Sequence, residues 1–325
     1  MRRLATSLLL LILVAGALAG GGMWLAVERY RTPGPLAADR TIVVPRGFGV
    51  EEIADQLEAE GVLASRWLLL GGVRFTEGRG LRAGEYLFPA GISAEGVVGL
   101  LRSGRTVLRR FTVPEGLTSA QIVALLATEP AMSGETPPPP PEGSLLPETY
   151  NFSWGDGREG MVERMQRAMR EAVAEAWGRR AEGLPIRRPE DLVTLASIVE
   201  KETGVAAERA RVAGVFVNRL RRNMRLQSDP TVIYGLTSGS GSLGRPLTRA
   251  DWRHVSPYNT YVIDGLPPGP IANPGRASLL AAVAPERHEY LYFVADGTGG
   301  HAFATTLAEH NRNVARWRQV NGTDR

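Results

Sequence analysis

The 325-residue sequence contains no cysteine. This absence excludes disulfide bonds, thiol catalysis and zinc sites built from cysteine. It does not exclude export, because an exported protein can be stable without disulfides. Histidine is scarce too, with four in the chain. His301 and His310 lie nine residues apart with no clear third ligand, so we predict no metal site.

Lysine is nearly absent as well. Lys201 is the only one, so the positive charge of the chain comes almost entirely from arginine. A net charge of +4 would suit nucleic acid in a cytosolic protein. The chain shows no RNA-binding or DNA-binding motif, however, and we expect no nucleic-acid partner.

One long hydrophobic run is present, at the N-terminus. Arg2 and Arg3 precede the apolar stretch 4–27, which has about 24 residues against the ~20 that are needed to cross a bilayer. The two arginines should stay in the cytoplasm, so the remainder of the chain is expected on the extracytoplasmic (periplasmic) side.

The segment Ala17-Leu18-Ala19 has the composition of a signal-peptidase site. The apolar run continues beyond it, and Trp24 and Tyr30 suit a membrane interface. We therefore expect residues 1–30 to form an uncleaved, single-pass anchor in the cytoplasmic (inner) membrane. Outside that membrane, a basic protein suits anionic lipid headgroups and acidic wall polymers.

Three segments of the chain repeat one pattern, VPRGFGVEEIADQL, FPAGISAEGVVGLL and VPEGLTSAQIVALL. Each has a Pro-x-Gly turn followed by apolar residues at helical spacing, and Leu57, Leu101 and Leu126 close the three copies. We predict three strand-turn-helix units. After a linker at 31–39, the units in 40–110 resemble LysM modules, which bind the glycan strands of peptidoglycan. The alternative is that they form only a spacer.

The larger domain is expected to span 111–325, which gives an α+β fold overall. Five consecutive prolines in 133–141 predict an extended surface loop. The stretch from Glu159 to Arg180 predicts an amphipathic helix whose methionines belong to the core. A second helix, from about Ala206 to Arg222, is expected to direct its arginines outward. Tyr290 to Val294 is expected to be a buried strand.

The helix expected to carry the chemistry starts near Pro189, where a missing N–H costs nothing. At about 100° per residue, Glu200 and Glu202 fall on opposite flanks of its apolar stripe. A carboxyl at the margin of an apolar face is partly desolvated, which raises its pKa and suits a general acid. This pattern does not choose between the two glutamates. The stripe consists of Leu192, Leu195, Ala196, Val199 and Thr203.

The motif SIVEKETG is followed in order by VFVNRL, LQSDPTVIYG, SPYNTY, GLPPGPIANPG and YLYFVADGTGGHAF. This order, from about Arg40 to the C-terminus, resembles the YceG-like (MltG) family of endolytic murein transglycosylases. EGSLLPETYNF resembles the family signature EGYLFPDTY, with Ser144 in place of an aromatic residue. The resemblance implies that Glu200, the first glutamate of the EKE run, is the catalytic acid.

The resemblance also implies a substrate site. Amide and phenol groups on a proline-rich loop suit the N-acetyl and hydroxyl groups of an amino sugar. The alternative is that this loop has only a structural role. The residues expected to contact the substrate are Gln227, Ser228, Asp229, Tyr234, Tyr258, Asn259, Tyr261 and His301.

The implied activity is that of a lyase of the cell envelope. It would cut the bond between N-acetylmuramic acid and N-acetylglucosamine within nascent glycan strands and leave a 1,6-anhydromuramyl end. One carboxyl suffices, because the nucleophile is the muramyl 6-hydroxyl, and no cofactor is required. The expected partners are peptidoglycan strands and the membrane, with penicillin-binding proteins and other wall synthases as candidate protein partners.

Three alternatives stay open. A hydrolase with two carboxylates (a muramidase) could use Asp229 or Glu202 as the second carboxylate. A membrane-tethered scaffold could bind glycan without cutting it. A lyase that uses pyridoxal phosphate would need Lys201, whose solvated position on the helix argues against that role.

Overall fold

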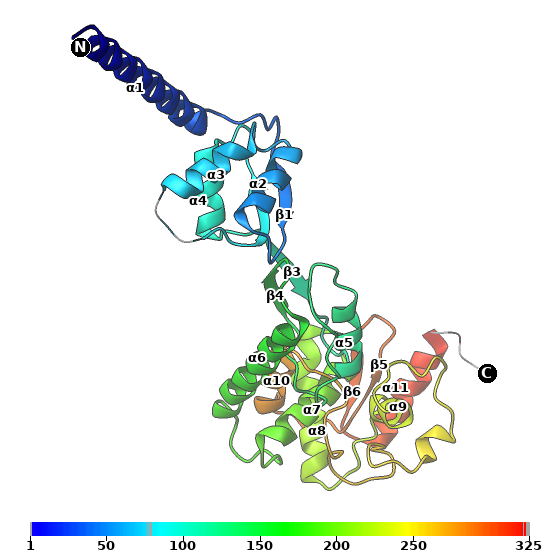
Figure 1. Cartoon of the computed structure of the whole chain (residues 1–325). Coiled ribbons are helices and arrows are strands. Elements are labelled where there is room, and N and C mark those ends of the chain that lie inside the picture. Colours follow the sequence, from blue (N-terminus) through cyan, green and yellow to red (C-terminus); the bar gives the residue numbers. More distant parts are fainter. Residues whose placement is uncertain (1, 77, 79, 321, 323–325) are drawn as a thin grey trace. The chain divides into compact units, whose positions relative to one another are not determined.

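The structure is a computed structural model that describes residues 2–76, 78, 80–320 and 322. Figure 1 shows the elements along the chain, which divides into two compact units. The small unit comprises Met1–Arg109 and Asn151–Gly155, and the large unit comprises Arg110–Tyr150 and Asp156–Arg325. The fold therefore mixes helices with short sheets.

Helix α1 opens the small unit and spans Arg2–Arg31. Within it, the 23 residues of Leu9–Arg31 have a mean hydropathy of 2.1, and none of that window is buried. By length and composition, this helix is long and apolar enough to cross a membrane. The apolar helix expected from the sequence is therefore present.

A two-stranded antiparallel sheet forms the core of the small unit together with three helices. Ile42 lies opposite Tyr86 in the sheet. Alternate residues of a strand face one side, so Ile42, Val44, Tyr86 and Phe88 all reach the core. The elements of this core are β1 (Arg40–Val44), α2 (Val50–Ala59), α3 (Arg66–Phe75), β2 (Gly84–Phe88) and α4 (Ala94–Ser103).

The repeated motif produces three strand-turn-helix units, as predicted. They are β1 with α2, β2 with α4, and β3 (Leu108–Thr112) with α5 (Ser119–Ala127). In the second and third units a polar residue after the turn caps the helix: the Ser93 side chain accepts a hydrogen bond from the Gly96 N–H, and Thr118 forms a reciprocal cap with Gln121. In the first unit the residue at this position is Gly49, whose N–H donates to the Glu52 carboxylate. The repeat is thus a local folding signal with its own helix caps.

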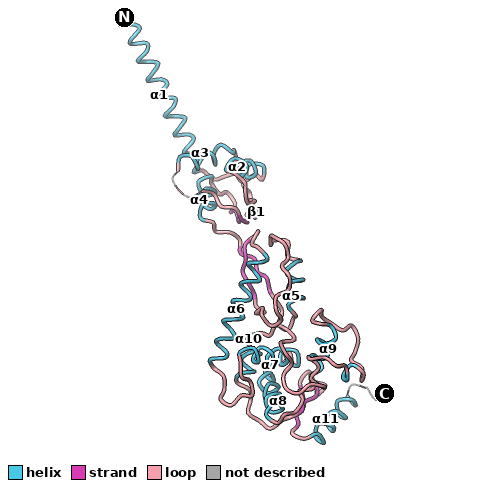
Figure 2. The backbone as a smooth tube through the Cα atoms, turned by 60° about the horizontal axis from the view of Figure 1, so that its bottom comes forward, coloured by secondary structure: helices cyan, strands magenta, loops and turns pink. Residues whose placement is uncertain are grey.

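The large unit is built around α7, which contacts α6, α8, α9 and α10 (Figure 2). Residues 192–199 of α7 are buried without interruption. Strand β4 pairs with β3, and β5 pairs with β6 as an antiparallel hairpin. The remaining elements are β4 (Thr149–Ser153), α6 (Arg158–Gly178), α7 (Pro189–Glu202), η1 (Ala206–Glu208), α8 (Arg209–Arg221), α9 (Asp229–Thr237), η2 (Asp251–Arg253), α10 (Arg276–Val283), β5 (Tyr292–Ala295), β6 (His301–Ala304) and α11 (Leu307–Val320).

The predicted helices of this unit are present, and two other predictions, one on the arginines of α8 and one on a strand, need correction. The methionine stripe on α6 is buried, as expected for core. Arg219 on α8, expected to face solvent, is only 7% exposed, because other elements pack against that side of the helix as well. The predicted buried strand is wrong in part: β5 begins at Tyr292, and its residues are only half-buried because one side of the hairpin borders a cavity.

Gly143 tests how tightly the large unit is packed. Its φ of 74° lies in the left-handed region, and a Cβ there would lie 2.6 Å from the Pro270 ring and 2.8 Å from a Val193 methyl. Gly183 has a similar φ of 69°, but a Cβ there would meet nothing within 4 Å. Gly143→Ala should therefore lose about 1–3 kcal/mol more stability than Gly183→Ala. Thermal unfolding followed by circular dichroism measures the difference. Equal losses would show that backbone conformation alone matters.

Candidate active site

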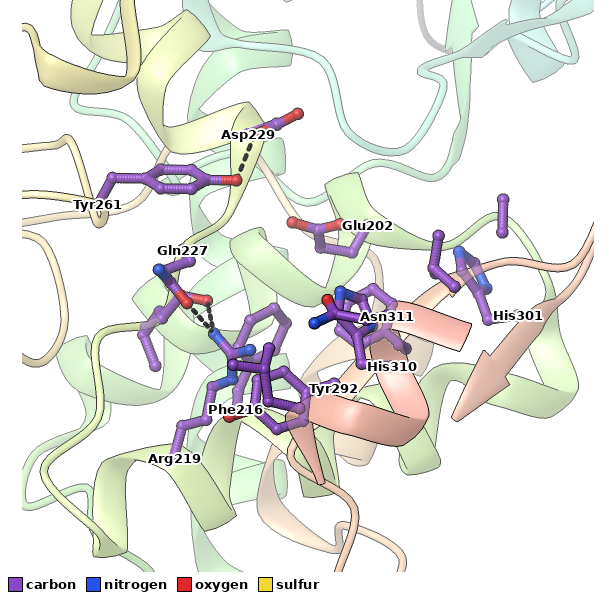
Figure 3. Close-up of a pocket in the computed structure, with 15 residues that line it drawn as sticks. Glu202, Phe216, Arg219, Gln227, Asp229, Tyr261, Tyr292, His301, His310 and Asn311 are labelled. Atoms are coloured by element: carbon purple, nitrogen blue, oxygen red, sulfur yellow. Dashed lines mark hydrogen bonds between the residues drawn. The ribbon is translucent and has the colours of Figure 1, made fainter. Parts of the chain in front are cut away.

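A cavity of about 510 Å³ lies in the large unit, where six separate segments of the chain meet (Figure 3). The segments are the end of α7, helix α8, the turn before α9 with the first residue of α9, the loop between η2 and α10, the β5–β6 hairpin and helix α11. The polar residues that line it are Glu202, Arg219, Gln227, Asp229, Tyr261, His301, His310 and Asn311.

Glu202, the last residue of α7, places its carboxyl in this cavity. Burial raises its pKa to about 7, and the nearby Asp229 contributes to the rise. The Ser228 hydroxyl donates a 2.5 Å hydrogen bond to Oε1 of Glu202, and this bond lowers the pKa of Glu202. The desolvation effect is the larger one. Glu202 therefore keeps its proton close to neutral pH, as a general acid must.

Glu200 has different surroundings, as expected for the opposite flank of the helix. Its side chain is only 5% exposed, and it is not among the residues that line the cavity. One carboxylate oxygen accepts a 2.9 Å hydrogen bond from the Gly275 N–H, and the other lies 3.4 Å from Arg209. Arg209 also pairs with Glu115 at 3.1 Å. Glu200 is thus held by a cation and a backbone donor.

Asp229 begins α9 on one side of the cavity. Its Oδ1 accepts a 2.6 Å hydrogen bond from the Tyr261 hydroxyl and a 3.0 Å bond from the Trp252 indole N–H. Burial raises the pKa of Tyr261, with Asp229 as a further cause, so this phenol remains a donor. The LQSDPTVIYG motif therefore supplies a carboxylate whose position is fixed by two aromatic donors.

Gln227 lies in the same turn with a φ of 53°, a left-handed conformation that is uncommon for a residue with a side chain. Its N–H donates to the Thr260 carbonyl at 3.1 Å, and its side-chain oxygen accepts from Arg219 at 3.1 Å. These contacts hold the strained turn against the cavity. Such strain tends to occur at functional sites.

The Arg219 guanidinium was not expected in the site, and it forms part of the cavity lining. It donates to the backbone carbonyls of Leu291 at 2.6 Å, Leu226 at 2.8 Å and Arg225 at 3.1 Å. The guanidinium carbon Cζ of Arg219 lies 5.1 Å from the centre of the Tyr292 ring. Burial lowers the pKa of this arginine. Four hydrogen-bond acceptors, counting Gln227, thus offset the cost of burying the charge.

His301 reaches the cavity from β6, and Glu208 holds it in place. The His301 Nδ1 lies 2.7 Å from the Glu208 carboxylate, which also accepts from the His301 backbone N–H at 3.0 Å. Both side chains are largely buried. The sequence did not indicate a role for Glu208, because its partner His301 lies 93 positions away along the chain. It orients the imidazole and leaves Nε2 free of this contact.

Helix α11 brings two further residues that the prediction of the site omitted, His310 and Asn311. The His310 ring stacks on Tyr292 with centroids 5.3 Å apart, and burial lowers its pKa, with Arg219 as a second cause. In the sequence, His310 stood out only as a candidate metal ligand nine residues from His301. Within the described part of the chain, no group of three or more acidic or histidine residues is placed to hold a metal ion.

The other predicted substrate residues lie away from the cavity lining or are buried. Ser228 is 1% exposed and acts on Glu202. Asn259 is fully buried, and its amide donates to the carbonyl of His254 at 2.7 Å. Tyr234 and Tyr258 pack on each other with ring centroids 4.7 Å apart. A contact between these residues and a substrate stays a prediction.

Comparison with known proteins gives consistent matches. The sequence profile of the YceG-like family matches residues 42–316. An endolytic murein transglycosylase of Bacillus subtilis (strain 168) is 33% identical over 303 residues, which cover 83% of this chain and 82% of that protein. An endolytic murein transglycosylase of Streptococcus pneumoniae serotype 2 is 29% identical over 324 residues, which cover 85% of this chain and 58% of that longer protein.

A solved structure agrees with the sequence matches. The crystal structure of a yceG-like protein from Listeria monocytogenes is 31% identical, with a TM-score of 0.54, and the match covers 85% of this chain and 99% of that chain. The family profile extends over most of the sequence, and the Bacillus relative is matched over most of its own length. This chain belongs to the YceG-like family.

Proposed function

We propose that this protein is an endolytic murein transglycosylase, a lyase that cuts peptidoglycan strands internally. Relatives at 29% and 33% identity over most of the chain carry that name. The observation that carries the proposal is the carboxyl of Glu202, which has its pKa raised to about 7 and lies in a polar cavity at the end of the EKE motif. A protonated carboxyl in such a place suits cleavage of a glycosidic bond.

In the proposed reaction, Glu202 donates its proton to the glycosidic oxygen between N-acetylmuramic acid and N-acetylglucosamine. The bond from that oxygen to the muramyl anomeric carbon breaks, and the N-acetylglucosamine part leaves with a new hydroxyl. The muramyl 6-hydroxyl then attacks the anomeric carbon and gives its proton to the Glu202 carboxylate. The product is a 1,6-anhydromuramyl end, and Glu202 regains its acid form without consuming water.

This proposal assigns the acid to Glu202, whereas resemblance to the family motif had suggested Glu200. The two positions differ in what surrounds them. Glu200 accepts hydrogen bonds from Arg209 and Gly275 and does not line the cavity, while Glu202 is desolvated beside the cavity. The desolvated environment of Glu202 suits an acid that must hold its proton.

Other cavity residues are proposed as contacts to the sugar chain. Gln227, Asp229, Tyr261 and His301 line the same cavity as Glu202. Tyr261 and Asp229 form a donor–acceptor pair that a sugar hydroxyl can join, and His301 is held by Glu208. These residues supply the small number of placed polar groups typical of a carbohydrate-sized site.

We place the enzyme in the cytoplasmic membrane, with α1 as a single-pass anchor and the rest of the chain on the outer side. The length of α1 and the arginines before it support this topology. The β1-α2-α3-β2 core of the small unit supports a LysM-like, glycan-binding role. Wall synthases, including penicillin-binding proteins, are candidate partners because they make the nascent strands.

A two-carboxylate hydrolase is the second candidate, because Asp229 lines the cavity together with Glu202. The two reactions leave different products. Mass analysis of muropeptides from purified glycan strands should find anhydromuramyl ends, which are lighter by one water than the reducing ends of a hydrolase. Reducing ends alone would establish hydrolysis.

The first functional prediction compares the two glutamates. Glu202→Gln keeps the shape of the side chain and its bond to Ser228 but cannot donate a proton. Cleavage should fall by about 10²–10⁴-fold, the usual loss of a general acid. Glu200→Gln should keep most activity and lose stability instead, because Arg209 then loses a charged partner. Purified variants are assayed on glycan strands, with folding checked by circular dichroism. The reverse ranking would return the acid to Glu200.

The second functional prediction concerns pH. The acid form of Glu202 is the active one at the start of the reaction, and its pKa is raised to about 7. The cleavage rate should therefore decline as pH rises through about 7, well above the range in which an ordinary carboxyl ionises. A pH–rate profile on glycan strands checks this. A decline centred near the ordinary glutamate value would contradict the assignment.

The third functional prediction concerns stability. The folded protein holds a proton on Glu202 between the ordinary pKa of 4.5 and about 7, whereas the unfolded chain has released it. The free energy of unfolding should fall as pH rises through that window. Glu202→Gln removes this dependence, so the variant should gain stability over the parent at alkaline pH and not at acidic pH. Thermal unfolding at both pH values measures it. An equal change at both would exclude a charge effect.

A further inference from the structure

Helix α3 of the small unit carries an exposed aromatic face. Trp67 is 70% exposed and Phe75 is 78% exposed. Residues at i, i+4 and i+8 share one side of a helix, so Trp67, Gly71 and Phe75 form one stripe. Large aromatic side chains gain most from leaving water, and two of them on one exposed stripe indicate a surface that meets something apolar.

This stripe borders a groove of about 300 Å³ that α3 shares with α1. The α1 side of the groove repeats at helical spacing, so one stripe of the anchor helix faces one stripe of α3. The lining residues are Met23, Ala26, Val27, Tyr30 and Arg31 from α1, Trp67, Leu68, Gly71, Gly72 and Phe75 from α3, and Thr76 and Glu95 at the edge of the groove. The walls are therefore mainly apolar on both sides.

The junction between the two helices is closely packed. A Cβ on Gly72 would lie 2.4 Å from the Tyr30 ring, so only glycine lets that ring approach α3 so closely. Arg31 also lies 3.7 Å from Glu95 on α4. Tyr30 packs against the core of the small unit as well. The α3 stripe is thus held at the level of the last turns of α1.

Those turns are where a membrane-spanning helix leaves the hydrocarbon. About 20 residues cross the bilayer core, and the apolar window ends in the arginine-containing turn up to Arg31. Tryptophan and other aromatic residues favour this interface, and arginines there pair with lipid phosphates. Arg74 is exposed beside Phe75. Aromatic area and positive charge therefore occur together at interfacial depth.

We infer that the Trp67–Phe75 face of α3 inserts into the outer interface of the membrane, with phospholipid acyl chains filling the groove between α3 and α1. The occupant is lipid because the groove is continuous with the helix that enters the bilayer. This inference rests on the proposed anchor and is independent of the chemistry at Glu202. It gives the small unit a second membrane contact, which holds it against the surface.

The absence of native cysteine makes a direct test possible. Phe75→Cys and Trp67→Cys each give the full-length protein a single labelling site for a polarity-sensitive dye. The matched control is Leu87→Cys, which replaces an apolar residue on β2 that is 48% exposed. Leu87 does not belong to the aromatic stripe of α3, and α1 packs mainly against α3 and α4. The labelled proteins are placed in phosphatidylethanolamine and phosphatidylglycerol vesicles, part of whose lipids carry a nitroxide high on the acyl chain.

Lipid insertion predicts a blue-shifted emission and several-fold stronger nitroxide quenching at positions 75 and 67 than at position 87. The inference is overturned if the protein floats with the vesicles while all three labels behave alike. It is also overturned if labels 75 and 67 are shielded from a water-soluble quencher but not quenched by lipid, because a protein would then cover the face. If the labelled proteins do not float with the vesicles, both the membrane anchor and this inference are overturned. The glycan-cleavage assay tests the proposed enzymatic activity separately.

Discussion

Burial of α7 over eight consecutive residues is the constraint on which the large unit depends. No face of the helix between 192 and 199 is open to water, so its polar groups must be satisfied internally. Ser197 does so by donating to the Thr194 carbonyl at 2.7 Å and accepting from the Ile271 N–H at 3.0 Å. Ionisable groups of α7 therefore occur only outside this stretch, in the first turn with Glu190 and Asp191 and at the C-terminal end, where the helix emerges. The EKE motif occupies that end.

The two glutamates at this end have different neighbours. Glu200 accepts hydrogen bonds from a guanidinium and a backbone N–H, which fix its side chain against Arg209 and Gly275. Glu202 meets the Ser228 hydroxyl, a weaker donor, in a site where desolvation dominates and raises its pKa. Glu200 therefore links α7 to Arg209 and Gly275. Glu202 keeps its proton close to neutral pH, and its ionisation above that pH destabilises the folded state. A carboxyl whose pKa is raised by burial beside a cavity is typical of catalytic sites.

The sequence predicted the features that depend on neighbours along the chain. Strand-turn-helix units, the methionine stripe of α6 and the opposite flanks of Glu200 and Glu202 all follow from local spacing. It could not decide which flank faces a cavity, because the groups that decide it, such as Gly275, lie 75 residues away. The buried Arg219 was missed for the same reason. Its partners come from segments whose packing leaves no periodic signal.

Arg219 shows how residues from separate segments become one site. Its guanidinium joins the carbonyls of Leu226 and Leu291, so the turn before α9 and the chain entering β5 are tied to α8 by a single side chain. That turn contains Gln227 in its strained conformation and leads directly to Asp229. Because a lysine has no rigid fork of donors, it could not hold both carbonyls in this geometry. The shape of the cavity beside Glu202 therefore depends on a buried arginine that need not touch the reacting atoms.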